Sequence, residues 1–152
     1  MSSMCKNITL IISDPKHPIN SSVRQWALDK KDGKRIETVQ TISEATGGDL
    51  CFLLSCNEIV PKEFLKCYQH VLVVHASDLP EGRGWSPHIW QIVNGATEIV
   101  VSLLEAAEKV DSGDILKKTT KFIPKYFIYD DIIGAINKAH LELMDYAIDN
   151  YG

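Results

Sequence analysis

The sequence predicts an α/β protein: a three-layer, Rossmann-like domain with a mostly parallel sheet. Short apolar runs alternate with amphipathic segments along the chain, and this alternation is typical of strands joined by helices. The run Val71-Leu72-Val73-Val74 contains no polar residue, as expected of a parallel strand buried on both faces. A length of 152 residues fits one domain around a single core, so we expect residues 1–152 to form a single domain.

Three strands and two helices are expected before Val71. Ile8–Ile12 is apolar and β-branched, which favours a first strand. Asn20 or Ser21 can cap a helix that continues to about Lys30. The remaining elements expected here are an edge strand over Ile36–Thr41, a buried strand over Leu50–Leu54, and a short helix that Pro61 opens and that contains Phe64, Leu65 and Tyr68.

The strand that ends at His75 is followed by a polar loop with two prolines and two glycines. A helix capped by Ser86 and stopped by Gly95 is expected after this loop. Alternation along Glu98–Glu105 predicts a strand with Ile99, Val101 and Leu103 on one face and Val100 and Leu104 on the other, and Asp114–Phe122 is expected to be extended. From about Asp130 one apolar stripe predicts a long helix, and a surplus apolar face on it could belong to the core or to a homodimer. The stripe consists of Ile132, Ile133, Ile136, Ala139, Leu143, Met144, Ala147 and Ile148.

The composition argues against several classes of function. The formal net charge of -4 gives no electrostatic reason to bind nucleic acid or an anionic membrane. No apolar stretch is long enough to span a bilayer, and no signal peptide is evident before the first strand. The four cysteines have no CxxC or finger-like spacing, and no histidine–carboxylate spacing indicates a metal site. We therefore expect a reduced, cytoplasmic protein without a bound metal.

His75 is the first candidate for chemistry because it directly follows a buried strand. Ligands and catalytic groups of open α/β sheets gather at the carboxyl ends of parallel strands. An imidazole that titrates near neutral pH can accept a proton and return it. The alternative is a strand-end histidine hydrogen-bonded to the backbone of the following loop, and strand position alone leaves both interpretations open.

Two segments carry a specific pattern of residues. The first fits His-x-Ser-x-Leu-Pro with Arg-Gly a few residues later, through His75, Ser77, Leu79, Pro80, Arg83 and Gly84. The second, Asp111-Ser112-Gly113-Asp114, fits Asp-x-Gly-Asp. In this order and spacing, the chain from about Asp49 to Lys117 resembles the folate-dependent formyltransferase family. That family transfers a formyl group from 10-formyltetrahydrofolate to an amine. The sequence of residues 77–90 looks most similar to the branches of this family that formylate amino sugars.

The resemblance implies roles for particular residues. His75 would take the proton from the amine and return it to the leaving folate nitrogen, and Asp111 would orient its ring. Ser77 and Arg83 would contact the substrate. Turn formation is the alternative for Asp111 and Ser77, and bracing of the loop is the alternative for Arg83. The residues implied to line the pterin pocket are Ser55, Cys56, Asn57, Glu58 and Ile59.

Val73 departs from the family pattern, which has asparagine two residues before the histidine. In the family this asparagine binds the formyl oxygen as negative charge develops on it, and loss of such a donor costs about a hundredfold or more in rate. Asn57, a backbone N–H or a protonated His75 could serve instead. Two other interpretations stay open: a catalytically impaired folate-binding or regulatory protein, or a hydrolase of the formyl donor.

Two of the family's acceptors are disfavoured by the sequence. Members that formylate tRNA append a further domain, which we do not expect here. Members that act on glycinamide ribonucleotide carry a glycine-rich phosphate loop, whereas Ser13–Asn20 contains no glycine. The expected acceptor is therefore the amine of a small molecule, such as a nucleotide-linked amino sugar.

Overall fold

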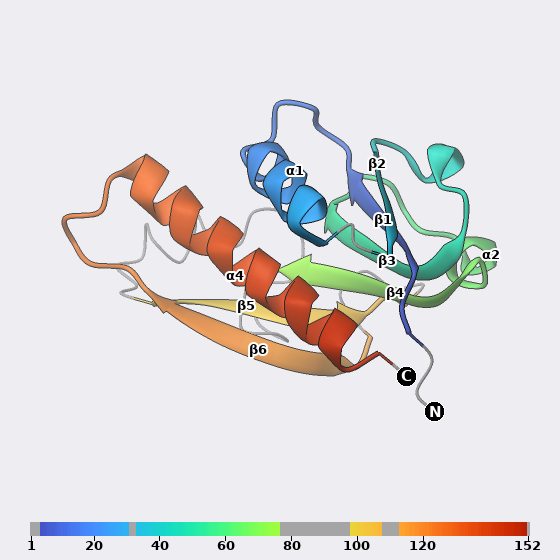
Figure 1. Cartoon of the computed structure of the whole chain (residues 1–152). Coiled ribbons are helices and arrows are strands. Elements are labelled where there is room, and N and C mark those ends of the chain that lie inside the picture. The colour runs from blue at the N-terminus through green and yellow to red at the C-terminus, as the bar shows by residue number, and fades with distance from the viewer. Residues whose placement is uncertain (1–3, 31–32, 77–97, 108–112, 152) are drawn as a thin grey trace.

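The computed structural model describes residues 4–30, 33–76, 98–107 and 113–151, which form one sheet with helices on both faces (Figure 1). In chain order the elements are β1 (Asn7–Ile12), α1 (Ile19–Lys30), β2 (Arg35–Val39), the 3-10 turn η1 (Ile42–Glu44), β3 (Gly48–Ser55), α2 (Lys62–Leu65), β4 (Tyr68–His75), β5 (Glu98–Glu105), β6 (Ile115–Phe122) and α4 (Tyr129–Asp149).

The sheet has six strands within the described residues, in the order β2-β1-β3-β4-β5-β6. The pairs β1–β2, β1–β3 and β3–β4 are parallel, while β5 runs antiparallel to both β4 and β6. Only β5 is therefore reversed among these strands, which confirms the predicted mostly parallel α/β sheet. Because β1, β3 and β4 run in the same direction and are neighbours, their carboxyl ends meet at one edge, which we call the carboxyl edge.

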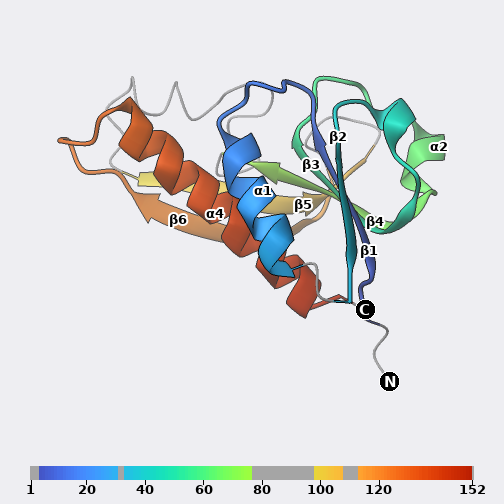
Figure 2. The same cartoon turned by 45° about the horizontal axis from the view of Figure 1, so that its top comes forward.

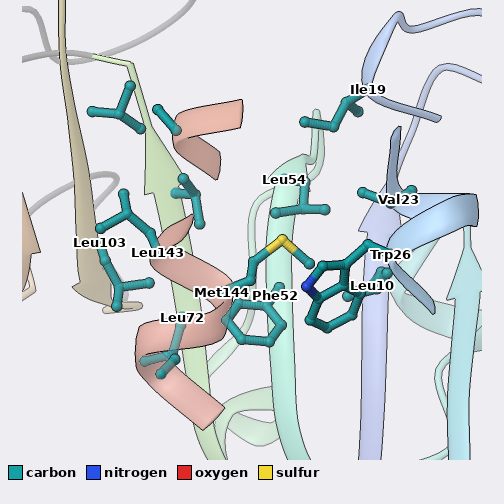
Figure 3. Packing of buried hydrophobic residues seen from close by; sticks show 14 of the residues in the cluster. Leu10, Ile19, Val23, Trp26, Phe52, Leu54, Leu72, Leu103, Leu143 and Met144 are labelled. Atoms are coloured by element: carbon teal, nitrogen blue, oxygen red, sulfur yellow. The ribbon is translucent and has the colours of Figure 1, made fainter. Parts of the chain in front are cut away.

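The larger part of the core lies between the sheet and the two longer helices, α1 and α4 (Figures 1 and 2). Met144 of α4 lies beside Phe52 of β3 and Trp26 of α1, and both Phe52 and Met144 are fully buried (Figure 3). The indole Nε1 of Trp26 donates a hydrogen bond of 2.8 Å to Asp145, so α1 and α4 are also joined by a polar contact. Burying three such large side chains stabilises this face by several kcal/mol, at roughly 1.5–3 kcal/mol each.

The opposite face of the sheet is covered by the short helix α2. Phe64 of α2 packs with Leu53 and Val71 of the two central strands. Beneath it, the Tyr68 hydroxyl donates to Thr9 Oγ1 at 2.7 Å, and Thr9 Oγ1 donates to Glu37 at 2.8 Å. These bonds satisfy polar groups that would otherwise be buried without a partner.

The sequence prediction is wrong at Tyr68, which begins β4 instead of extending the helix opened by Pro61. The apolar positions Phe64, Leu65 and Tyr68 fit a helix, but the tertiary hydrogen bond from Tyr68 to Thr9 holds Tyr68 in the sheet. The expected edge strand also ends earlier, at Val39 instead of Thr41. The other expected strands and helices are found within a few residues of their predicted limits. The helix expected between Ser86 and Gly95 lies outside the described residues.

The stripe predicted for the last helix belongs to the core. Ile136, Ala139, Leu143 and Met144 are buried against the sheet and α1. His140 on the same helix is also buried, and its Nδ1 lies 2.8 Å from the carbonyl oxygen of Ile136. A homodimer stays a prediction. Among the described helices, none is both long enough and apolar enough to cross a membrane.

Candidate active site at the carboxyl edge of the sheet

His75 is the last residue of β4 and lies level with the end of β3. Leu53 of β3 pairs with Val73 of β4, and Ser55 and His75 each lie two residues further along their strands. Both residues are half-buried. The alternation of a strand places His75 on the same face as Val73, the face that packs against α2. The structure thus brings His75 and the first of the expected pterin-binding residues to one edge, and their roles stay predictions.

Ser102 of β5 lies directly opposite His75. Residues opposite each other in an antiparallel pair share a face, with Cβ atoms about 4.5–5.5 Å apart. Ser102 is fully buried, so its hydroxyl is a polar group inside the apolar interior next to the candidate histidine. The sequence analysis did not single out Ser102. The signal that could have found it is a serine within the otherwise apolar run Ile99–Leu104.

Val73 occupies an apolar row across the sheet. It pairs with Leu53 on one side and with Leu104 on the other, and it is half-buried. The position at which the family pattern has an oxyanion-binding amide is therefore lined by hydrocarbon. Neither flanking side chain has a hydrogen-bond donor that could replace the missing amide.

Hydrogen bonds fix the expected pterin segment to the loop after β1. The backbone N–H of Ser13 donates to the carbonyl oxygen of Ser55 at 2.7 Å. The N–H of Asn57 donates to Ser13 Oγ at 3.0 Å. The segment after β3 is therefore held at both Ser55 and Asn57, while the Asn57 side chain is exposed at the edge. Ser13 was not predicted as a site residue, and its structural role here is to shape this edge.

Within the pterin segment, Glu58 and Ile59 differ in their surroundings. The Glu58 carboxylate accepts a hydrogen bond of 2.9 Å from the N–H of Ile42, so it anchors η1. The Ile59 side chain is 79% exposed, which leaves an apolar surface available to a planar ligand. The Cys56 thiol donates to the Glu58 carbonyl oxygen at 3.7 Å, and burial raises the pKa of this thiol. A raised pKa favours the protonated thiol, which is the less nucleophilic form.

The loop between β1 and α1 is closed by its own polar side chains. The Asn20 amide donates to the carbonyl oxygens of Asp14 and His17, at 3.0 and 2.9 Å. His17 Nδ1 accepts the N–H of Ile19 at 3.1 Å, as a capping side chain does. Burial lowers the pKa of His17, although the nearby Asp14 carboxylate opposes this shift. Sequence reasoning missed His17, which follows the first strand and precedes a helix start.

Strands β5 and β6 approach each other closely where the end of β5 meets Gly113 and Asp114. The N–H of Glu105 donates to the carbonyl oxygen of Asp114 at 2.9 Å. A Cβ atom at Gly113 would lie 1.7 Å from the carbonyl oxygen of Glu105, so only glycine fits there. Asp111 lies two residues before this point and, like Ser77 and Arg83, falls outside the described residues. In the described part of the chain, no three His, Cys, Asp or Glu side chains are grouped so that they could hold a metal ion.

Comparison with known families gives a match over most of the chain. A family model described as "Formyl transferase" matches residues 8–138. Methionyl-tRNA formyltransferase from Listeria welshimeri is 29% identical over 104 residues, which are 66% of this chain and 33% of that protein. The same enzyme from Geotalea daltonii is 38% identical over 90 residues, 58% of this chain and 28% of that protein. The chain therefore spans about a third of the length of the curated relatives it matches.

Solved structures with different acceptors share this fold. Methionyl-tRNA formyltransferase from Clostridium thermocellum superposes with a TM-score of 0.77 at 20% identity, over 94% of this chain and 64% of that chain. Phosphoribosylglycinamide formyltransferase from Streptococcus pneumoniae gives 0.68 at 15% identity, over 96% and 98%. A sugar N-formyltransferase from Shewanella gives 0.67 at 15% identity, over 95% and 69%. At these identities the similarity establishes the fold.

Proposed function

This chain belongs to the formyl transferase family, and from that membership we propose that it transfers a formyl group from 10-formyltetrahydrofolate to the amine of a small molecule. The observation that carries the proposal is the position of His75. It ends a central strand, level with Ser55 and on the face that α2 covers. A proton-transfer group and the expected pterin segment thus share the carboxyl edge, where open α/β sheets bind ligands.

The proposed reaction needs one proton to be moved between two nitrogens. The amine nitrogen attacks the formyl carbon, and the bond between that carbon and the folate nitrogen breaks. His75 accepts the proton that the attacking amine loses and returns it to the leaving folate nitrogen. Asp111 orients the imidazole in this proposal, and Ser77 and Arg83 contact the acceptor. The products are the N-formylated amine and tetrahydrofolate.

The donor is proposed to bind along the segment from Ser55 to Ile59. Hydrogen bonds hold Ser55 and Asn57 to Ser13, so this segment presents a fixed backbone to the pterin. The exposed Ile59 offers an apolar contact, while Glu58 is already committed to η1. A pre-formed site loses less conformational entropy when the ligand binds.

We propose a nucleotide-linked amino sugar as the acceptor. The fold does not choose the acceptor, because relatives named for methionyl-tRNA, phosphoribosylglycinamide and sugars all share it. Two features of the sequence support an amino-sugar acceptor. Residues 77–90 resemble the branches of the family that formylate amino sugars. Ser13–Asn20 contains no glycine, whereas a loop that binds phosphate through its backbone relies on glycine. The four free cysteines are consistent with a reducing cytoplasmic location, which we also propose.

A second function is favoured by Val73. The apolar row formed with Leu53 and Leu104 offers no side-chain donor at the position of the family's asparagine. A protein that binds the folate donor without transferring the formyl group would have this arrangement. Hydrolysis of the donor is a third outcome, in which His75 activates water in place of the amine.

A single-turnover assay tests these functions together. The purified chain is mixed with 10-formyltetrahydrofolate in the presence and absence of a nucleotide-linked amino sugar, and formylated sugar, tetrahydrofolate and formate are measured. We expect His75→Ala to slow transfer by about a hundredfold or more while folate still binds. His70→Ala is the matched control, because His70 lies on the same strand near its other end.

The products of this assay distinguish the three functions: transferase, hydrolase and folate-binding protein. Formylated sugar that depends on His75 supports the transferase, and formate released without acceptor supports the hydrolase. Folate binding without either product supports the binding protein. Equal transfer rates for the parent and His75→Ala would reject the proposed mechanism.

A further inference from the structure

A hollow separate from the carboxyl-edge site lies between helix α1 and the terminal strand β2. Its volume is ≈ 520 Å³. Val23 and Ala27 of α1 and Ile36 of β2 are its apolar lining residues, and Arg24, Lys34 and Arg35 are its charged ones. Alternation along β2 turns the Arg35 side chain to the opposite face of the sheet from Ile36, so Arg24 and Lys34 are the cations on the α1 side. Strands β1 and β3 separate β2 from β4, which carries His75, so this groove lies apart from His75 and meets the edge described above only at Asn20.

The charge of the groove is opposite to that of the whole chain. Its lining includes three cationic residues and no acidic residue, although the formal net charge of the chain is -4. Among the described residues, Arg24, Lys34 and Arg35 take part in no ion pair. Glu37, the acidic residue of β2, lies on the face of the sheet away from α1, where it accepts hydrogen bonds from Thr9 and Thr46 and is near the charge of Arg35. Such a surface attracts an anionic partner.

The strand that borders the groove has one unpaired edge within the described sheet. β2 pairs with β1 along Arg35–Val39 and is the last strand of the order on that side. A terminal strand exposes backbone N–H and C=O groups that can pair with another chain. The terminal strand at the opposite side, β6, carries Lys117, Lys118 and Lys121 along its length, which discourages such pairing there.

We propose that this groove binds an extended acidic segment of a partner protein, which adds to β2 as a further strand beside α1. Alternate side chains of an added strand point to opposite faces, so an apolar set on one face contacts the apolar lining residues while the backbone pairs with β2. Carboxylates on the same face of the segment as these apolar side chains pair with Arg24 and Lys34. An apolar centre with charges at its exposed rim is the arrangement of a protein-binding surface. Arg24 is exposed here.

Fluorescence anisotropy tests the proposal with a labelled peptide in which every second residue is threonine and the positions between alternate between valine and glutamate, so that one face of the strand carries both. We expect Arg24→Glu and Lys34→Glu each to weaken binding of this peptide by about tenfold, and added salt to weaken it as well. Lys66→Glu is the matched control, because Lys66 is exposed beside α2 on the other side of the sheet. Circular dichroism confirms that each variant is folded. Hydrogen exchange of the full chain is expected to slow at Arg35–Val39 when the peptide binds.

Several results would overturn the proposal. One is absence of peptide binding, and another is equal binding of the same peptide with lysine in place of glutamate. A third is unchanged exchange at Arg35–Val39 in the complex. Displacement of the acidic peptide by a thymidine oligonucleotide or by pyrophosphate at similar concentrations would identify a general polyanion site, which also contradicts a peptide-binding strand edge. The formyl-transfer assay does not enter this test, so the two proposals fail independently.

Discussion

His75 and Ser102 lie directly opposite each other across the antiparallel pair of β4 and β5. The histidine is half-buried at the carboxyl edge, whereas the serine is fully buried. Buried hydroxyls in proteins are almost always hydrogen-bonded, and the imidazole is the titratable group next to this one. We therefore propose that Ser102 positions His75 in the proposed reaction.

Replacing Ser102 tests this positioning role. We expect Ser102→Ala to slow formyl transfer by about tenfold, because the ring loses a neighbour that restricts its orientation. Ser102→Thr keeps the hydroxyl and is expected to restore most of the rate. The rates are measured at several pH values together with folate affinity. If both variants transfer at the parental rate, Ser102 only fills space in the strand pair.

Val73→Asn tests whether the apolar row limits catalysis. An amide at this position could donate to the formyl oxygen, so we expect transfer to become faster by about tenfold to a hundredfold. The same change places a polar group between Leu53 and Leu104 and is expected to lower the free energy of unfolding by about 1–3 kcal/mol. Val73→Leu is the control, because leucine has the shape of asparagine without its donor. A parental rate in Val73→Asn would mean that another donor already stabilises the oxyanion.

Two glycine-to-alanine changes are expected to have opposite effects. At Gly113 a Cβ atom would lie 1.7 Å from the Glu105 carbonyl oxygen, so Gly113→Ala forces the hairpin open and destabilises the protein. At Gly134, inside α4, a Cβ atom meets no heavy atom within 4 Å, so Gly134→Ala should stabilise by up to about 1 kcal/mol. Urea unfolding measures both free energies. A gain in stability for Gly113→Ala would contradict the close approach of the two hairpin arms.

Asp49 is expected to make stability depend on acid pH. Its carboxylate accepts the N–H groups of Lys6 and Asn7, both at 2.9 Å, and the Tyr151 hydroxyl at 3.2 Å. The backbone hydrogen bonds from Asn7 and then Lys6 lower the pKa of Asp49. A lowered folded pKa contributes stability above the unfolded value, near 3.9, and this contribution is lost as pH falls through the folded value.

Asp49→Asn should therefore lose about 1 kcal/mol at neutral pH, a value reduced for the partial exposure of the site. The difference from the parent should shrink as pH falls below the unfolded pKa and through the lowered folded pKa, where the parental carboxyl becomes protonated. Urea unfolding over a series of acid pH values measures this, with Glu98→Gln as a control at an exposed position. A difference that stays constant with pH would show that the charge of Asp49 does not contribute.

Much of the candidate site could be predicted because it depends on local patterns. The apolar run before His75 places this histidine at a strand end, and the polar residues from Ser55 onward mark the end of a second strand. Ser102 and Ser13 could not be identified in the same way. Their importance comes from strand register and from a hydrogen bond between residues 44 positions apart, which no local pattern encodes.

Alternating apolar segments and residue motifs, taken by themselves, determined the α/β class, the strands and helices near their observed limits, and the family resemblance. The tertiary structure decided which residues face one another: His75 with Ser102, Val73 with Leu53 and Leu104, and Tyr68 with Thr9. Local periodicity specifies which side of an element is buried, because burial removes apolar surface from water. It does not specify the neighbour, because strand order and register depend on how the whole sheet assembles.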